Sequence, residues 1–378
     1  MKIIAPKENL VNALLMAENI VASKVTKSIL SNILLETEDK KLKVISTNLD
    51  MSIKVLINAK IEKEGGIALH AKTLTDAIKL FSQDNILIEV DETINQAIIK
   101  SMNKEDKIEY KMNGIPKSDF PVFPALKNEN IKQFTISQKI LKDMIRKIIY
   151  AIPDKDLTFT YMGIIGAKLE IKDKYLILTA TDGIRLSTIK TPFNVNFELD
   201  NIILPKKLLT ELLKILSDKG EVKISVAENS IYFELNNIVI VSRLQEGKFP
   251  DYVNVIPKEY KIKVIFFTKE IANAIKRVSL ISKAEETYVH LSFDKNKVYI
   301  ISSDPEIGEA KEEIGITYDY DKFEIRFNSQ FLLDAINSID TEQFVMEFNS
   351  PHSAATIKEE GSDDFLGLIM PIRLEWCF

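Results

Sequence analysis

Residues 204–216, LPKKLLTELLKIL, decide the fold because they join the end of a strand to an amphipathic helix. Leucines at helical spacing form one face of this helix, namely Leu208, Leu209, Leu212, Leu213 and Leu216. Polar side chains are assigned to the other face, namely Lys206, Lys207, Thr210, Glu211 and Lys214. The stretch therefore predicts a helix that packs its leucines against a sheet.

The same pattern occurs at two other places in the chain. Residues 68–80, ALHAKTLTDAIKL, form an earlier copy, and residues 326–336, RFNSQFLLDAI, form a later one. Aligning the three copies on Leu74, Leu209 and Leu332 also aligns an acidic residue two positions later in each copy. We interpret the three stretches as one element of an internal repeat.

Each repeat opens with a strand followed by another helix. These openings lie at residues 2–15, 133–145 and 264–275. Ser137 and Thr268 precede the helical pattern and are predicted to be helix N-caps.

A hairpin-like pair of strands follows each opening and ends in a similar short motif. The last residues of these motifs, Asn48, Asp182 and Asp304, are 134 and 122 residues apart. A period of this length indicates whole domains rather than the short units of a solenoid. We therefore predict an α+β protein with three domains, at residues 1–127, 128–256 and 257–378.

Composition excludes several classes of protein. The chain has 378 residues, of which 46% are hydrophobic and 28% are charged, and it has one cysteine, so no internal disulfide can form. No stretch is apolar enough to span a membrane, and residues 1–8 lack the apolar core of a signal peptide. We expect a cytoplasmic protein, and the net charge of −5 argues against a uniformly basic nucleic-acid binder.

The sequence offers little for catalysis. His70, His290 and His352 are far apart, and the chain has neither a zinc-protease motif nor a glycine-rich phosphate loop. We predict no catalytic residue, no metal and no cofactor. Two alternatives stay open, an enzyme without a recognisable motif and a repeat-built interaction scaffold.

Three motifs set in the repeat carry a family resemblance. They are TDGIRL at residues 181–186, SRLQEGKFPDY at 242–252 and MPIRL at 370–374. Together with the repeat, they resemble the bacterial DNA polymerase III β subunit family, the β sliding clamps, over essentially the whole chain. The resemblance implies a ring-shaped, head-to-tail homodimer with sheets outside and helices lining a hole for duplex DNA. It also implies a non-catalytic processivity factor that tethers the replicative polymerase, the clamp loader and other partners, in the cytoplasm and at the nucleoid during replication, with no membrane contact.

The charge of the expected lining helices agrees with this function. These helices, at residues 7–20, 72–82, 138–150, 206–217, 269–281 and 330–339, sum to +6 in a chain whose net charge is −5. A basic lining attracts phosphates without reading bases. The predicted DNA-binding residues are Lys24, Lys27, Lys72, Lys79, Lys142, Arg146, Lys206, Lys207 and Lys214.

The resemblance also implies a hydrophobic pocket for a partner peptide between the second and third domains. Its expected lining is Tyr161, Thr181, Gly183, Ile184, Arg185, Leu186, Pro250, Val255, Ala354, Leu368, Ile369, Met370, Pro371, Ile372 and Arg373. Ile184 departs from the family, which has histidine there, and makes the pocket more apolar. Residues 375–378 extend past the usual end of the family, and whether this tail covers the pocket stays open.

The resemblance finally implies a subunit interface. Tyr110 and Met112, on an edge strand of the first domain, match family interface positions. Leu280 and Ile281, at the end of a helix in the third domain, are their expected apolar partners. Such residues would form an exposed apolar patch in a monomer.

Overall fold

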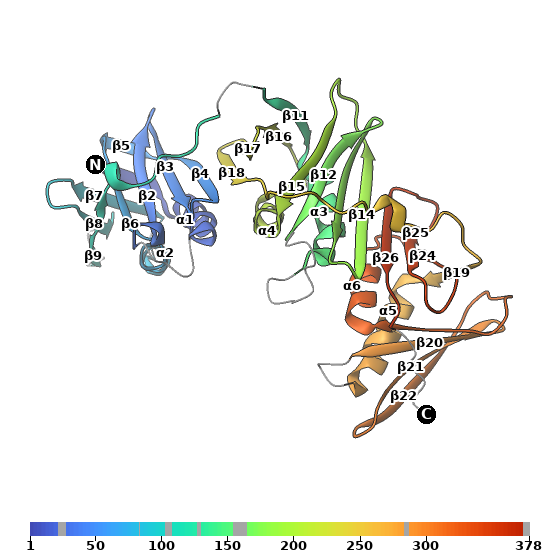
Figure 1. Ribbon diagram of the computed structural model, residues 1–378. Helices are drawn as coiled ribbons and strands as arrows, with labels where there is room; N and C mark the ends of the chain where they lie inside the picture. The colour runs from blue at the N-terminus through green and yellow to red at the C-terminus, as the bar shows by residue number, and fades with distance from the viewer. Residues whose placement is uncertain are drawn as a thin grey trace. The chain divides into compact units, whose positions relative to one another are not determined.

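Six α-helices and four β-sheets make up the described part of the computed structural model (Figure 1), which covers residues 1–21, 28–82, 84–102, 108–126, 130–153, 165–282 and 287–372. The helices are α1 (Lys7–Ile20), α2 (Ala71–Leu80), α3 (Gln138–Ile148), α4 (Lys206–Ile215), α5 (Thr268–Val278) and α6 (Ser329–Asn337). Short 3-10 helices are η1 (Ser28–Ser31), η2 (Lys117–Asp119), η3 (Ile149–Ala151), η4 (Val253–Val255) and η5 (Ser279–Ile281). All six expected helices are present.

Two compact units contain the sheets, and the first unit comprises residues 1–139 and 214–244. Its five-stranded sheet has the order β5 (Lys60–Lys63), β1 (Lys2–Pro6), β7 (Asn85–Asp91), β8 (Gln96–Ser101) and β9 (Glu109–Asn113). Its nine-stranded sheet has the order β10 (Ile115–Pro116), β6 (Gly66–His70), β2 (Asn32–Glu38), β3 (Lys41–Thr47), β4 (Met51–Asn58), β18 (Ile238–Arg243), β17 (Ser230–Leu235), β16 (Glu221–Val226) and β11 (Lys132–Ser137).

The second unit comprises residues 140–213 and 245–378. Its eight-stranded sheet has the order β15 (Leu199–Pro205), β12 (Gly166–Lys172), β13 (Tyr175–Thr181), β14 (Arg185–Pro192), β26 (Phe365–Ile369), β25 (Ala355–Glu359), β24 (Gln343–Phe348) and β19 (Ile262–Phe267). Its four-stranded sheet has the order β22 (Gly308–Gly315), β21 (Lys297–Asp304), β20 (Tyr288–Asp294) and β23 (Phe323–Asn328).

Two antiparallel joints connect the three repeats. β4 of the first repeat pairs with β18 of the second, and β14 of the second pairs with β26 of the third. Each long sheet therefore combines strands of two repeats (Figure 1). Within the described residues, β9 and β22 lie at the ends of their sheets and pair on one side only.

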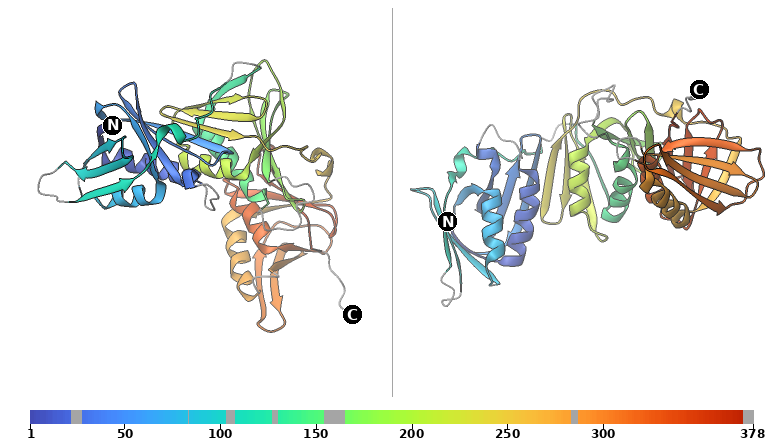
Figure 2. Two further views of the ribbon diagram at one scale, coloured as in Figure 1. Left: turned by 60° about the vertical axis from the view of Figure 1, so that its left-hand side comes forward. Right: turned by 90° about the horizontal axis from the view of Figure 1, so that it is seen from below.

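The helices cover the sheets in pairs. α1 packs against α2 and against β3 and β4, while α5 packs against α6 and against β21 and β22 (Figure 2). Leu74, Leu209 and Leu332, on which the three copies were aligned, are all fully buried. The leucine pattern therefore identified the core-facing side of each helix.

Two local predictions were wrong. Glu211, assigned to the polar face, is only 5% exposed. Thr268 is the first residue of α5 rather than its N-cap, because β19 continues to Phe267. The Thr268 hydroxyl instead donates to the carbonyl of Thr341, 2.9 Å away. None of the described helices is long and apolar enough to cross a membrane.

Candidate functional site

An apolar cluster lies at the joint of β14 and β26. Leu186 and Leu368 are directly opposite in the two strands, and both pack with Ala354. Half-buried Tyr252 and Ile256, on either side of η4, cover the cluster. The structure thus brings together three expected pocket residues, one from the second repeat and two from the third.

The turn between β13 and β14 is held in one conformation by its own side chains. The Thr181 hydroxyl donates to the Arg185 carbonyl at 2.8 Å, and one Asp182 carboxylate oxygen accepts the Ile184 and Arg185 amides, both at 2.9 Å. Gly183 has φ of +90°, a conformation that glycine adopts without strain. The turn therefore presents Ile184 from a rigid support.

Arg185 connects this turn to α6. Its guanidinium donates to Asp182 at 3.0 Å and to Asp334 at 2.6 Å, and it lies 4.0 Å from the centre of the Phe331 ring. Buried charges need such paired, hydrogen-bonded surroundings. Arg185, expected in the pocket wall, therefore also fixes the turn to the third repeat through Asp334 and Phe331. The sequence identified Asp334 as a repeated acidic position, but it assigned neither residue to the site.

Large apolar side chains are exposed around the cluster. Ile184 is 41% exposed, and Met370 and Ile372 are each 42% exposed. The Met370 amide donates to the Ile184 carbonyl at 2.9 Å, so these two residues are neighbours. Val253 and Val255 of η4 are 62% and 56% exposed beside the covering residues. We name these five residues the apolar rim.

The remaining predicted pocket residues divide into described and undescribed positions, and one lining residue was missed. Pro250 and Pro371 are half-buried, and Ile369 is fully buried in β26. Tyr252, missed as a lining residue although it ends the quoted motif 242–252, donates its hydroxyl to Glu170 at 2.8 Å, and burial raises its pKa to about 12. Tyr161, Arg373 and the tail 375–378 lie outside the described residues.

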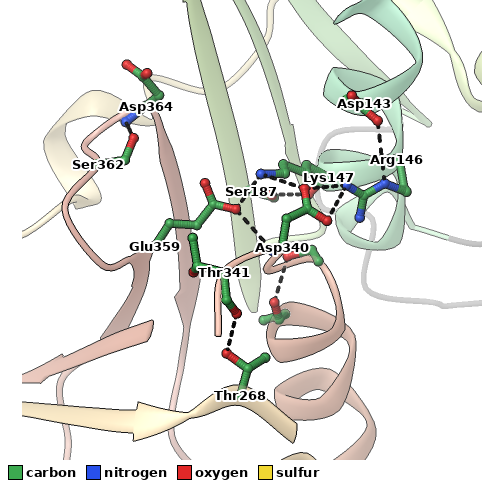
Figure 3. Close-up of polar contacts among 12 residues, drawn as sticks. Asp143, Arg146, Lys147, Ser187, Thr268, Asp340, Thr341, Glu359, Ser362 and Asp364 are labelled. Carbon is green, nitrogen blue, oxygen red and sulfur yellow. Dashed lines mark hydrogen bonds and ion pairs between the residues drawn. The ribbon is translucent and has the colours of Figure 1, made fainter. Parts of the chain in front are cut away.

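An ion-pair network crosses from α3 to the third repeat beside the joint (Figure 3). The Lys147 ammonium, with a side chain only 8% exposed, contacts Glu359 at 2.5 Å and Asp340 at 3.1 Å. Arg146 forms two hydrogen bonds to Asp340, at 2.8 and 2.6 Å. Lys147 therefore contributes no accessible charge, and Arg146, predicted to bind DNA, already contacts a carboxylate.

The other predicted DNA-binding residues that the structure describes lie on helices. Lys72 and Lys79, on α2, are exposed and lie 3.3 and 3.9 Å from Asp76. The Lys206 ammonium donates to the Ile152 carbonyl at 2.9 Å. Lys207 and Lys214 are exposed on α4, and Lys142 is half-buried on α3. Lys24 and Lys27 lie outside the described residues.

The predicted interface residues lie on or beside β9 and β22, two of the strands at sheet ends. Tyr110 and Met112 are half-buried on β9, and the Tyr110 ring meets Phe81 edge to face, with centroids 5.6 Å apart. Leu280, in η5 next to β22, is 80% exposed. Ile281 is half-buried.

No cluster of three or more histidine, cysteine or acidic side chains that could hold a metal occurs in the described residues. The only described histidine with a carboxylate contact is His290, 3.5 Å from Glu324. Burial lowers the pKa of His290 despite that carboxylate.

Family models match almost the whole chain. Residues 1–124 match the N-terminal domain of the DNA polymerase III beta subunit, residues 135–251 its central domain and residues 253–373 its C-terminal domain.

Individual proteins show the same similarity over nearly full length. The beta sliding clamp of Halalkalibacterium halodurans is 29% identical over 368 residues, which cover 93% of this chain and 94% of that protein. A crystal structure of the DNA polymerase sliding clamp from Bacillus subtilis has a TM-score of 0.91 at 27% identity and covers 99% of this chain and 100% of that one. A DNA polymerase III subunit beta from Pseudomonas aeruginosa, bound to griselimycin, gives the same scores and coverage.

Proposed function

This chain belongs to the DNA polymerase III beta subunit family, and from that premise we propose that it is a sliding clamp, the processivity factor of the bacterial replicative polymerase. Two copies encircle duplex DNA, slide along it and tether partner proteins, and the chain itself catalyses nothing. The observation that carries this proposal is the match of all three domain models, in order, to a chain whose three repeats are joined edge to edge. The three clamp domains are residues 1–127, 128–256 and 257–378, and the protein acts in the cytoplasm, at the nucleoid.

The open edges support a head-to-tail homodimer. β9 and β22 lie at the two ends of a series of repeats that is otherwise connected by β4·β18 and β14·β26. An unpaired edge with half-buried apolar residues is a site where a further strand can add. If β9 of one copy pairs with β22 of the other, two copies make two identical joints and the ring closes with twofold symmetry.

The charge of the helices supports sequence-independent DNA binding. The six helices keep the formal sum of +6, in which Arg146 and Lys147 are paired with carboxylates, and Lys72, Lys79, Lys207 and Lys214 are exposed on α2 and α4. Lysine is a flexible point charge that suits weak phosphate contacts. Such contacts hold DNA without fixing a register, which sliding requires. Lys24, Lys27, Lys142, Arg146 and Lys206 complete the proposed set, with Arg146 in a minor role because it contacts Asp340.

The apolar rim supports binding of a short hydrophobic peptide. Exposed apolar side chains of this size, gathered around a buried cluster, are typical of a surface that a partner covers. The Met370 thioether adapts to peptides of different shape. We propose that polymerases and the clamp loader insert an apolar peptide between Ile184, Met370 and Val255, against Leu186 and Leu368.

Dependence on DNA topology tests the clamp function. Loaded onto nicked circular DNA by a clamp loader, the protein should stay bound through a gel-filtration column and should be lost when the circle is cut. An interaction scaffold would show no difference between circular and linear DNA. Retention that ignores topology, or hydrolysis of DNA or nucleotide by the protein alone, would contradict the proposal.

Salt dependence tests the proposed DNA contacts. Lys72→Ala with Lys207→Ala should weaken DNA binding and reduce the slope of log K against log salt by about 0.9 for each phosphate contact removed. Lys223→Ala, in strand β16, is the matched control and should leave the slope unchanged. An unchanged slope in the double variant would remove these two lysines from the proposed site.

The pocket is tested by binding of a fluorescent peptide that ends in alternating leucine and phenylalanine. Met370→Asp should raise its dissociation constant about tenfold or more, because a charge would replace an apolar contact. Ile307→Asp, a similarly exposed apolar residue (53%) away from the rim, is the control. Equal effects of the two changes would contradict the site.

A further inference from the structure

The joints β4·β18 and β14·β26 define which residues should face each other if β9 of one copy pairs with β22 of another. In each repeat, directly opposite residues form a row across four strands, from the opening strand to the strand at the joint. These rows are Ile3, Ile88, Ile99 and Tyr110 in the first repeat; Phe134, Ile224, Phe233 and Ile240 in the second; and Val264, Met346, Ile357 and Gly367 in the third. Only Tyr110 in these rows is not buried, and it lies on the open edge β9.

Across each closed joint, the last member of the row meets an equivalent residue. Ile240 is opposite Ile53, and Gly367 is opposite Ser187. Ile53 and Ser187 in turn pair with Ser46 and Ala180, each two residues before the landmarks Asn48 and Asp182.

In the third repeat, the residue two positions before Asp304 identifies the residue of β22 that corresponds to Ile53 and Ser187. Ser302 precedes Asp304 by two positions and pairs with Ala310. Ala310 therefore corresponds to Ile53 and Ser187. By this equivalence, Tyr110 of one copy lies opposite Ala310 of a second copy.

That alignment places opposite charges in contact. Counting one residue in each direction from Tyr110 and Ala310 in an antiparallel pair puts Glu109 opposite Lys311 and Lys111 opposite Glu309. All four charged residues are exposed, while Tyr110 and Ala310 are half-buried. Inward-facing residues thus meet inward-facing residues, as directly opposite residues in a sheet must.

Neighbouring alignments fail this test. A slip of one residue would place inward-facing side chains opposite outward-facing ones. A slip of two residues in one direction would put Lys111 opposite Lys311, and in the other direction Glu109 opposite Glu309. Like charges directly opposite each other destabilise a sheet. The charge pattern therefore favours the alignment that the internal joints define.

Packing beneath the joint agrees with the same alignment. Tyr150 of η3 lies under the closed joint, where a Cβ on Gly367 would come within 3.1 Å of its hydroxyl. Leu280 of η5 is the corresponding residue of the third repeat, and Tyr110 corresponds to Gly367. At the closed joint the large Tyr150 lies under the small Gly367, whereas at the joint between copies the smaller Leu280 would lie under the large Tyr110. Leu280 therefore leaves space for the Tyr110 ring.

We propose that β9 of one copy pairs with β22 of another in a single register, specified by Glu109–Lys311 and Lys111–Glu309 contacts on its outer face above the Tyr110–Leu280 contact. This inference rests on the proposed homodimer and adds its register and its specificity. In the free chain, Lys111 lies 3.5 Å from Glu109, and Lys311 lies 4.0 Å from the centre of the Tyr299 ring. Both lysines exchange these intrachain contacts for carboxylates of the second copy.

Disulfide trapping tests the register. In a Cys377→Ser background, the double variant Lys111→Cys/Glu309→Cys should form covalent dimers on mild oxidation, because directly opposite Cα atoms lie about 4.5–5.5 Å apart. The matched variant Lys111→Cys/Lys311→Cys should not, since a two-residue offset adds about 6.6 Å along the strand. Trapping of the second variant in preference to the first would overturn the proposed register.

Charge reversal tests the specificity. Glu109→Lys or Lys311→Glu alone should raise the dimer dissociation constant about tenfold or more, because each of two joints replaces an attraction by a repulsion. The two changes together should restore it to within about threefold. Lys297→Glu, one strand inward and beside the same Tyr299 ring at 5.0 Å, is the control and should have little effect.

The outcomes separate this inference from the homodimer itself. A dimeric wild type whose two charge reversals do not compensate each other would overturn the register and leave the clamp intact. A wild type that is strictly monomeric by sedimentation at micromolar concentration would overturn the homodimer, and the register with it.

Discussion

The closed joint β14·β26 and the open edge β22 occupy the same place in successive repeats, yet they differ in chemistry. At the closed joint, Leu186 and Leu368 face each other, and both are at least 96% buried. On the open edge, the outward residues Glu309, Lys311 and Glu313 are exposed and charged. The same place in the repeat thus carries apolar side chains at a joint within the chain and charged side chains at the edge that we propose pairs with a second copy. Charged edge residues also hinder pairing with wrong partners.

Among the residues that the structure describes, the closed joint is supported by an ion-pair network between two repeats, and the open edge is not. Beneath the joint, Lys147 of α3 contacts Asp340 and Glu359 of the third repeat (Figure 3). Beside β22, Arg277 of α5 contacts Glu312 of the same repeat, at 2.9 Å from its Nε. The first network connects two repeats, whereas the second only attaches a helix to its own sheet.

Removal of Lys147, at the closed joint, should cause the largest loss in the free energy of unfolding. Lys147→Ala leaves the carboxylate of Glu359, only 12% exposed, without its cation. We expect the free energy of unfolding to fall by about 3–5 kcal/mol, as for other broken buried ion pairs. Urea denaturation followed by circular dichroism measures this change. Lys139→Ala, an exposed lysine of α3, should change stability by less than about 0.5 kcal/mol, and equal losses would show that the network does not support the joint.

Truncation of an apolar joint residue should have the next largest effect. Leu186→Ala should lower the free energy of unfolding by about 2–4 kcal/mol, because a fully packed leucine is replaced by a cavity. Met112→Ala on the half-buried edge β9 should lower monomer stability by less than about 1.5 kcal/mol. The measurement is thermal or urea unfolding at a concentration where the protein is monomeric. If both variants lose the same amount, the closed and open edges do not differ as described.

Leu280 gives a change that should affect association alone. Leu280→Ser should raise the dimer dissociation constant about tenfold, because an 80%-exposed leucine loses only the apolar contact made with a second copy. Its effect on monomer stability should be small. Sedimentation equilibrium measures the constant, and Leu49→Ser, at 52% exposure in another turn, is the control. A loss of monomer stability without weaker association would place Leu280 in its own domain's core instead.

The smallest expected effect is on the stability of the fold in acid, through the Asp340 carboxylate. Burial alone would raise the pKa of Asp340, but hydrogen bonds from Lys147 and Arg146 outweigh it and hold the pKa below its usual value of 3.8. A lowered pKa stabilises the fold above that usual value, and the contribution disappears as the pH falls through the lower folded-state value. Between about pH 4 and pH 2, the wild type should therefore lose stability more steeply than Asp340→Asn. Asp319→Asn, an exposed aspartate, is the control, and parallel curves for wild type and Asp340→Asn would contradict the expectation.

The local spacing of apolar residues predicted much of the fold. All six helices lie where the apolar spacing predicted them, because one residue in three or four on each helix must face a sheet. The three-domain α+β architecture also followed, since the landmarks Asn48, Asp182 and Asp304 repeat with the elements. Local patterns succeed where the relevant contact is within one element or between neighbours.

Contacts between residues far apart in the chain could not be predicted from the sequence. Lys147 and Glu359 are 212 positions apart, and nothing near either residue indicates the other. For the same reason the sequence did not indicate that Arg146, predicted to bind DNA, also contacts Asp340. Glu211 has the spacing of a polar-face residue, but tertiary packing buries it. The pocket residues Leu186, Ala354 and Leu368 were identified only through the family resemblance, and the structure brings them together.

The edge-to-edge joints mean that the middle repeat owns no complete sheet. Its strands complete the nine-stranded sheet on one side and the eight-stranded sheet on the other. Fragments separated at the borders between repeats would therefore expose unpaired strand edges and would tend to aggregate. Amide protons should accordingly be protected from exchange in blocks that follow the shared sheets rather than the three sequence repeats.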